Sequence, residues 1–185
     1  RDMGYRVGLA GKGHVFLGKA YPFIRAGKAN KGATGESSFG IEITRQFMAR
    51  DKTRPFFLIV ASANPHEPWS RGDATQYPPN ALQVPPFLND TLGLRKRLSA
   101  YLAEVSDLDR EVGLVDDELK KLGLHNDTIF IFTTEQGSSL PFGKWTTYDS
   151  GLKTAFMVRW PRKITANTVS DAMIEYVDVI PTLTD

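Results

Sequence analysis

The fold is constrained most strongly by short runs of apolar residues that alternate with helical patterns. Three of these runs are PFFLIVAS at 55–62, TIFIFTTE at 128–135 and TAFMVRW at 154–160. Short runs that are rich in branched and aromatic residues are typical of parallel strands buried on both faces. A further apolar run, from Tyr5 to Ala10, is closed by Gly11. The alternation predicts an α/β fold with a mostly parallel sheet sandwiched by helices.

The clearest helical period lies between residues 98 and 122. Apolar residues recur there at three- and four-residue steps, at Leu98, Leu102, Val105, Leu108, Val112, Val115, Leu119 and Leu122. The pattern predicts an amphipathic helix of roughly 28 residues, about 42 Å long, with Gly123 as its C-terminal stop. We expect its charged face to lie in water, including Arg110, Glu111, Lys120 and Lys121.

Less regular segments surround these elements. A short helix is predicted from Phe39 to Met48 and another from Ser170 to Leu183, the second interrupted by Pro181. Residues 64–90 contain too many prolines for regular structure and are expected to form a loop. His125, in the link after the long helix, is expected to face solvent and is given no role.

Composition narrows the possible functions. The 23 Lys and Arg residues nearly balance the 21 Asp and Glu residues, which argues against a nucleic-acid partner. The absence of cysteine excludes disulfides, thiolate ligands and a cysteine nucleophile within these residues. No apolar run reaches the roughly 18 to 20 residues that span a bilayer, and the first residues do not form a signal peptide. Both ends interrupt an apolar pattern, so we expect a fragment of a larger fold.

Polar residues gather where the predicted strands end. They are Lys12 and His14 after the first strand, Asn64 and His66 after the second, Glu135 and Gln136 after the third, and Lys144 in the following loop. Ligands of open α/β sheets bind just beyond the carboxyl ends of the strands. We therefore expect these residues to converge on one site.

The residue types indicate an anion site beside a metal. Lys12 and Lys144 supply positive charge for a tetrahedral oxyanion, and the two histidines can donate hydrogen bonds or protons near neutral pH. A sulfate or phosphate ester fits this set. Glu135 and Gln136 offer hard oxygen ligands that suit calcium or magnesium and not zinc. Two ligands do not complete such a site, so we expect the others to come from elsewhere.

Four segments, taken in order, resemble the type I sulfatases of the alkaline-phosphatase-like superfamily. They are GYRVGLAGKGHVF, PFFLIVASANPHEPW, YLAEVSDLDREVGLVDDELKKLGLHNDTIFIFTTEQG and PFGKWTTYDSGLKTAFMVRWP. The likeness as a whole covers nearly all 185 residues in the same order, and the branch it is most similar to is that of the heparan N-sulfatases, or sulfamidases.

The resemblance implies a role for each candidate residue. Lys12 and His14 would contact a formylglycine nucleophile, His66 would lie at the scissile ester oxygen, and Lys144 would bridge to the sulfate. Glu135 and Gln136 would bind the metal, with calcium expected and magnesium as the alternative. The implied reaction is hydrolysis of a sulfuric ester or sulfamate on a sulfated carbohydrate such as a glycosaminoglycan. The implied location is periplasmic, secreted or lysosome-like.

Two departures from the family pattern matter. The family usually has Asp with Asn or His where this chain has Glu135 and Gln136. The nucleophile motif, Cys or Ser followed by x-Pro-x-Arg, and an upstream pair of Asp ligands are absent. We therefore expect residues 1–185 to be part of the catalytic domain, lacking its N-terminal nucleophile and metal segment and its C-terminal subdomain, and to be inactive alone.

Two other functions stay open at this point. A phosphatase or phosphodiesterase of the same superfamily would use a Ser or Thr nucleophile and often two metals. A non-catalytic relative would bind sulfated glycan without releasing sulfate.

Overall fold

A three-stranded parallel sheet brings two of the predicted strand ends together. The computed structural model describes residues 3–13, 20–29 and 35–185. Strand β1 (Arg6–Gly11) pairs in parallel with β3 (Phe56–Ala61), in a register that sets Gly11 opposite Ala61. The short strand β2 (Ile24–Arg25) pairs in parallel with the other side of β1. The carboxyl ends of β1 and β3 are therefore neighbours.

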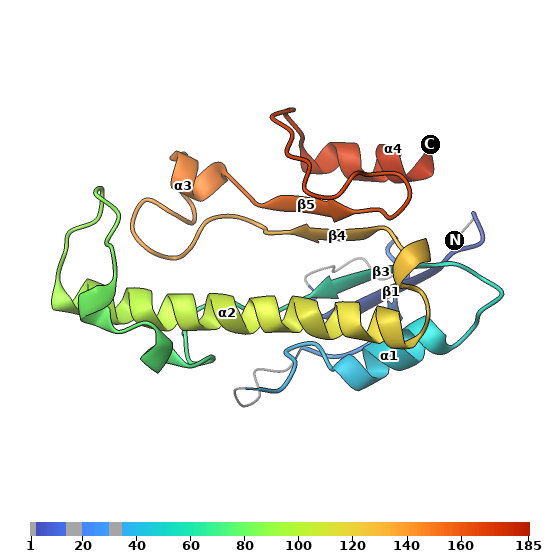
Figure 1. Ribbon diagram of the computed structural model, residues 1–185, viewed down its shortest axis with the longest axis horizontal. Coiled ribbons are helices and arrows are strands. Elements are labelled where there is room, and N and C mark those ends of the chain that lie inside the picture. The colour runs from blue at the N-terminus through green and yellow to red at the C-terminus, as the bar shows by residue number, and fades with distance from the viewer. Residues whose placement is uncertain (1–2, 14–19, 30–34) are drawn as a thin grey trace.

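A second sheet consists of β4 (Phe130–Thr133) and β5 (Phe156–Arg159), which pair antiparallel. In Figure 1 the arrowheads of β3 and β4 point the same way and that of β5 points back. Ala155 exchanges hydrogen bonds with Thr134, which shows that the chain re-enters the sheet at the end where β4 leaves it. A parallel neighbour requires a crossover to the opposite end, so β5 departs from the predicted parallel arrangement.

The predicted long helix is confirmed as α2 (Leu92–Lys121), which has 30 residues. The Thr91 hydroxyl accepts a hydrogen bond from the Leu94 N–H and caps the first turn. At the other end, Gly123 adopts φ 71°, and the Gly123 and Leu124 N–H groups donate to the carbonyls of Lys120 and Leu119. This pair of bonds is a Schellman motif, which ends the helix where the sequence predicts.

Smaller helices lie on opposite sides of the strands (Figure 1): α1 (Ile41–Ala49) on the side of α2, and α4 (Val179–Thr184) on the other. The helix predicted from Ser170 begins only at α4, after a 3-10 turn at Tyr176–Asp178. A capping box between Glu175 and Asp178 starts helical bonding at that point. Residues 64–90 form a loop with two 3-10 turns, close to the prediction.

Two apolar clusters hold these elements together. The first lies under β1 and includes Ala10, Phe39, Phe47 and Val115 of α2, with Phe130 of β4 packed against it. The second joins the start of α2 to two loops and contains Leu88, Leu98 and Leu140, with Trp69 packed against them.

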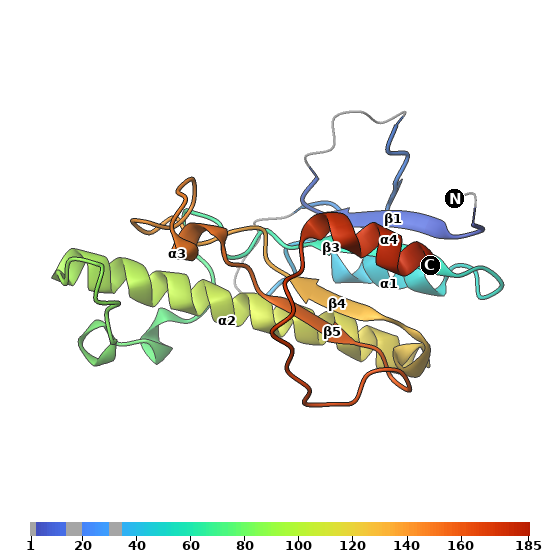
Figure 2. The ribbon, with the colours of Figure 1, turned by 90° about the horizontal axis from the view of Figure 1, so that it is seen from above.

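The elements joined by the second cluster lie to one side of the sheets (Figure 2). The N-terminal half of α2 extends beyond both sheets, and the segment that carries α3 (Asp149–Leu152) lies along it. Among the described residues, no helix combines the length and apolarity needed to cross a membrane.

Candidate active site

Lys12 is the first residue beyond β1. Its backbone N–H donates to the Ala61 carbonyl at 2.8 Å, so it leaves the sheet beside the last residue of β3. The side chain is half-buried. His14, predicted to act with Lys12, lies outside the described residues.

His66 lies in the loop that follows β3. Its backbone N–H donates to the Ala63 carbonyl at 3.1 Å, and its side chain is exposed. The ring Nδ1 lies 2.7 Å from the Glu67 carbonyl oxygen, which can only accept, so Nδ1 carries a proton. This tautomer leaves Nε2 as the ring atom available to exchange a proton with a ligand.

Glu135 and Gln136 follow the end of β4. The Glu135 side chain is exposed and that of Gln136 is half-buried. Within the described part of the chain, neither side chain makes a hydrogen bond or ion pair, so their oxygens are available to a cation. Among all the residues that the structure describes, there is no group of three or more His, Asp or Glu side chains that could hold a metal ion. The two oxygens therefore fit a hard cation only as part of a larger ligand set.

Lys144 is half-buried in the loop between β4 and α3. Its backbone N–H donates to the Ser138 carbonyl at 2.7 Å, and its ammonium lies 5.1 Å from the ring centre of the exposed Trp145. Leu140 of this loop packs in the same apolar cluster as Trp69 of the His66 loop. The structure thus joins the Lys144 and His66 loops through apolar packing.

The predicted residues are brought together unevenly. Lys12 and the His66 loop share one sheet edge, because β1 and β3 are paired to their last residues. Glu135 and Gln136 leave β4 in the direction in which β3 also ends (Figure 1). In the residues that the structure describes, no direct polar contact links these two side chains to Lys12, His66 or Lys144.

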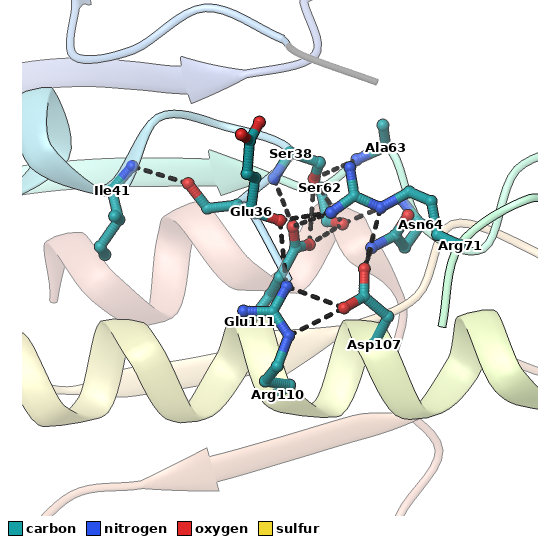
Figure 3. Close-up of polar contacts among 11 residues, drawn as sticks. Glu36, Ser38, Ile41, Ser62, Ala63, Asn64, Arg71, Asp107, Arg110 and Glu111 are labelled. Carbon is teal, nitrogen blue, oxygen red and sulfur yellow. Dashed lines mark hydrogen bonds and ion pairs between the residues drawn. The ribbon is translucent and has the colours of Figure 1, made fainter. Parts of the chain in front are cut away.

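Sequence reasoning missed a buried cluster of charges behind the His66 loop. Glu111, predicted to face water, is only 1% exposed. Its carboxylate accepts hydrogen bonds from the Ser38 N–H and hydroxyl and from the Ser62 hydroxyl, and it lies 3.7 Å from Arg71. Figure 3 shows these groups converging from α2, from the segment before α1 and from the loop beyond β3. The prediction failed because the helical pattern treats every Glu as a solvent-exposed polar residue and contains no information about the residues that pack against the helix.

A sequence signal for the cluster does exist. The buried carboxyl residues of α2 recur at three-, four- and seven-residue steps, at Glu104, Asp107, Glu111 and Glu118. Such a row lies along one face of a helix. Arg71, in the proline-rich loop, is the buried cation that meets the middle of the row.

Asp107 lies at the centre of this cluster. Burial by itself raises the pKa of its carboxyl group, but hydrogen bonds and charge from Arg110 and Arg71 outweigh burial, so the pKa is lowered. Asp107 is therefore an ionised carboxylate at neutral pH. The Arg110 guanidinium, half-buried, bonds the second Asp107 oxygen at 2.8 Å and the Glu36 carbonyl at 3.0 Å.

His125 also differs from its prediction. It is half-buried, and its Nδ1 lies 3.1 Å from the Asp116 carboxylate, which pairs with Arg159 of β5 at 2.9 Å. Arg159 contacts the imidazole ring as well. After the helix stop, the 3-10 turn His125–Asp127 folds back onto α2 and draws the ring under β5. The cluster ties α2 to the second sheet.

Comparison with known proteins identifies the family. Residues 40–185 match the family model described as Sulfatase, which is well over half of the chain. This chain belongs to the sulfatase family. The family predicted from the sequence is confirmed, and the phosphatase and non-catalytic readings are not favoured.

Two curated sulfatases are similar to this chain in sequence. N-sulphoglucosamine sulphohydrolase of Homo sapiens is 30% identical over 98% of this chain and 42% of that protein. An ulvan-active sulfatase of Formosa agariphila is 32% identical over 76% of this chain and 24% of that protein. The chain thus spans less than half the length of these curated relatives.

A solved structure supports the fold. It comes from work on the metabolism of multiple glycosaminoglycans by Bacteroides thetaiotaomicron, and it matches 98% of this chain and 50% of its own chain with a TM-score of 0.80 at 18% identity. The α/β fold of a sulfatase is therefore shared beyond sequence similarity.

Proposed function

We propose that the intact protein hydrolyses sulfuric esters or sulfamates of sulfated saccharides. Membership of the sulfatase family supports the reaction class. The observation that carries the proposal is the hydrogen bond between Lys12 N–H and Ala61 O at 2.8 Å, because it sets a cation beside the strand that leads to His66. A sulfuryl group bound there would meet a positive charge and a proton donor together.

The reaction breaks the bond between sulfur and the leaving oxygen or nitrogen, while a nucleophile bonds to sulfur. Negative charge grows on the transferring oxygens and on the leaving atom. Lys12, His14 and Lys144 would stabilise the sulfuryl oxygens and the nucleophile. His66, when protonated on both ring nitrogens, would donate the Nε2 proton to the leaving atom. The nucleophile, a formylglycine, would come from a segment outside residues 1–185, together with the remaining metal ligands.

Glu135 and Gln136 would supply two oxygens to a divalent cation, calcium in preference to magnesium. Their unengaged oxygens support this role, since hard cations bind carboxylate and amide oxygens. When bound, the cation would withdraw charge from the sulfate oxygens. A larger, flexible oxygen shell suits calcium better than the strict octahedron of magnesium, because the longer Glu and Gln side chains set the oxygens further from the strand.

Exposed aromatic residues beside Lys144 support a saccharide substrate. Trp145 is 90% exposed, and the Phe142 ring packs edge to face against Phe87 and Tyr148. Rings that present flat apolar faces to water suit the C–H faces of a sugar, while Lys144 faces its sulfate. The human relative is named for a sulfated glucosamine and the Formosa relative for ulvan, both saccharides. A periplasmic, secreted or lysosome-like location fits such polymers.

The test is a panel of substrates offered to the intact protein. We expect sulfate release from an aryl sulfate and from an N-sulfated or O-sulfated saccharide, and at least about 100-fold slower release of phosphate from the matching aryl phosphate. Faster phosphate than sulfate release would assign the protein to the phosphatases. Saccharide binding without release of sulfate would instead assign it to the non-catalytic glycan binders.

A further inference from the structure

The charged residues behind the His66 loop are buried more deeply than a solvated helix face allows. Arg71 is 5% exposed, Asp107 4% and Glu111 1%. Charged side chains of this kind are almost never so buried unless they are paired. Apolar residues of similar volume often stabilise a protein as well as a buried ion pair does, so stability alone does not account for the cluster. A charged cluster differs from an apolar one because hydrogen bonds and ion pairs are directional, so they fix the orientation of the side chains and backbone that they join.

One oxygen of Asp107 holds both ends of the segment from Asn64 to Arg71, which carries His66. Asp107 Oδ2 accepts a hydrogen bond from Asn64 Nδ2 at 2.9 Å and another from Arg71 Nε at 2.9 Å. Asn64 comes two residues before His66, and Arg71 comes five residues after it in the same loop. The segment from Asn64 to Arg71 is therefore closed at its base by a single carboxylate on α2, a continuous helix of 30 residues (Figure 3).

Glu111 fixes the residues between β3 and Asn64. The Ser62 hydroxyl donates to Glu111 Oε2 at 2.5 Å, and the Asn64 N–H donates back to the Ser62 oxygen at 2.9 Å. The Ala63 N–H donates to the Ser38 oxygen at 3.0 Å, and Ser38 itself is bonded to Glu111. Every residue from Ser62 to Asn64 is thus tied, directly or through one serine, to one carboxylate.

The exposed His66 ring depends on this base for its position. Its only bonds in the described part of the chain are local, from its N–H to Ala63 and from its ring to Glu67. A rotation of the Asn64 or Arg71 end would swing the imidazole, while β3 could remain in place. Displacing a reacting group by about 1 Å can cost a hundredfold in rate.

We propose that Asp107 and Glu111, together with Arg71, are positioning residues that aim the His66 imidazole at the leaving group of the substrate. The inference rests on the proposed function. It predicts that loss of the Asp107 carboxylate reproduces the loss of His66, and that the two losses are not additive, since they remove the same interaction.

The test compares Asp107→Asn, His66→Ala and the double variant of the intact protein. Two substrates are used, an activated aryl sulfate and a sulfated saccharide with a poor leaving group. For Asp107→Asn we expect kcat on the saccharide to fall about 10- to 100-fold, with less than about a threefold loss on the aryl sulfate. In the His66→Ala background, Asp107→Asn is expected to change neither rate.

Two further variants keep the test sharp. Asn64→Ala removes one bond to Asp107 and leaves the Arg71 ion pair in place, so it is expected to show the same split between substrates in a protein that folds. Asp116→Asn is the matched control, because it breaks an ion pair on the same helix that ties α2 to β5. It is expected to affect both substrates equally.

Hydrogen exchange gives a readout that does not depend on activity. In Asp107→Asn and Asn64→Ala, the amides of residues 62–64 and of His66 are expected to exchange at least about tenfold faster, while those of β1 are unchanged. Equal losses on both substrates, additive losses in the double variant, or unchanged exchange at 62–66 would overturn the positioning role. A wild-type protein inactive on every sulfate ester would refute the proposed function instead, and hydrogen exchange would then decide the positioning role by itself.

Discussion

At the scale of the residue, His66 offers a direct test of the chemistry. Because its Nδ1 proton is held by the Glu67 carbonyl, Nε2 is the ring atom that can take up a proton and pass it to a leaving group. Replacement of His66 by Ala should therefore lower kcat on a sulfated saccharide by about 100-fold or more and on an activated aryl sulfate far less. Steady-state rates on the two substrates measure the difference, and equal losses on both would remove His66 from the role of acid.

Asp107 should also make stability depend on pH. Its folded pKa lies below the usual value of 3.8, through Arg110 and Arg71. Its stabilisation is therefore complete above the unfolded pKa and is lost as the pH falls through the lower folded pKa. We expect Asp107→Asn to cost about 3 to 5 kcal/mol at neutral pH and to flatten the acid limb of the free energy of unfolding.

Urea unfolding between about pH 6 and pH 2 measures this effect. Asp149→Asn serves as the control, since its ion pair with Lys153 is 81% exposed on the Asp149 side and should contribute little. An acid limb as steep in Asp107→Asn as in the wild type would show that other carboxyl groups dominate it.

His66 and Glu111 illustrate what the sequence can and cannot predict at the scale of single residues. His66 is predictable because it follows an apolar run, and the carboxyl end of a parallel strand is where ligands bind. The partners of Glu111 are not, since Ser38 lies 73 residues away in sequence and no local pattern records that contact. A helical period shows that Glu111 flanks an apolar face and is silent about the cation across from it.

At the scale of the element, the His66 loop meets α2 at Gly72. This residue has φ 77°, and a Cβ built on it would lie 2.0 Å from the Ala103 carbonyl oxygen. Gly72→Ala should therefore destabilise the protein by about 1 to 3 kcal/mol, because the backbone strain adds to a clash with a helix that cannot move aside.

Gly113→Ala on α2 is the matched comparison. A Cβ there meets nothing within 4 Å, so the substitution should stabilise the protein by about 0.5 to 1 kcal/mol through helix propensity. Urea midpoints of the two variants test both signs together. A neutral Gly72→Ala would mean that the loop and the helix are less closely packed than these distances indicate.

Apolar runs and helical periods predict β1, β3, β4, β5 and α2 within a few residues, since these elements depend on which side chains avoid water, whereas the two-residue strand β2 has no such run and is not predicted. The direction of β5 is not predicted by such patterns. It depends on Ala155 bonding to Thr134, a contact between loop residues with no apolar period. The late start of α4 is similar, because it depends on one pair of capping bonds at Glu175.

At the scale of the whole molecule, α2 joins the two sheets. Its middle turns fix the loop beyond β3 through Asp107 and Glu111, and its last turns hold β5 through Asp116. Its middle turns therefore hold the end of β3, and its last turns hold the end of β5 that lies opposite the start of β4. One helix thus links the loop that carries His66 to the sheet that leads to Glu135, although the paired strands belong to separate sheets.

Calcium binding to the intact protein tests whether the end of β4 contributes to a common site. If Glu135 and Gln136 complete a calcium site with ligands from outside residues 1–185, calcium at about a hundred times its Kd should stabilise the protein by about 2.7 kcal/mol. Glu135→Ala should abolish most of the calcium-dependent rise in Tm, since a lost carboxylate weakens a hard-cation site more than a lost neutral oxygen. Glu42→Ala, which removes an exposed carboxylate of α1, should leave the rise unchanged. A full calcium response in Glu135→Ala would place the metal away from the end of β4, and the site would then have to be built without that strand.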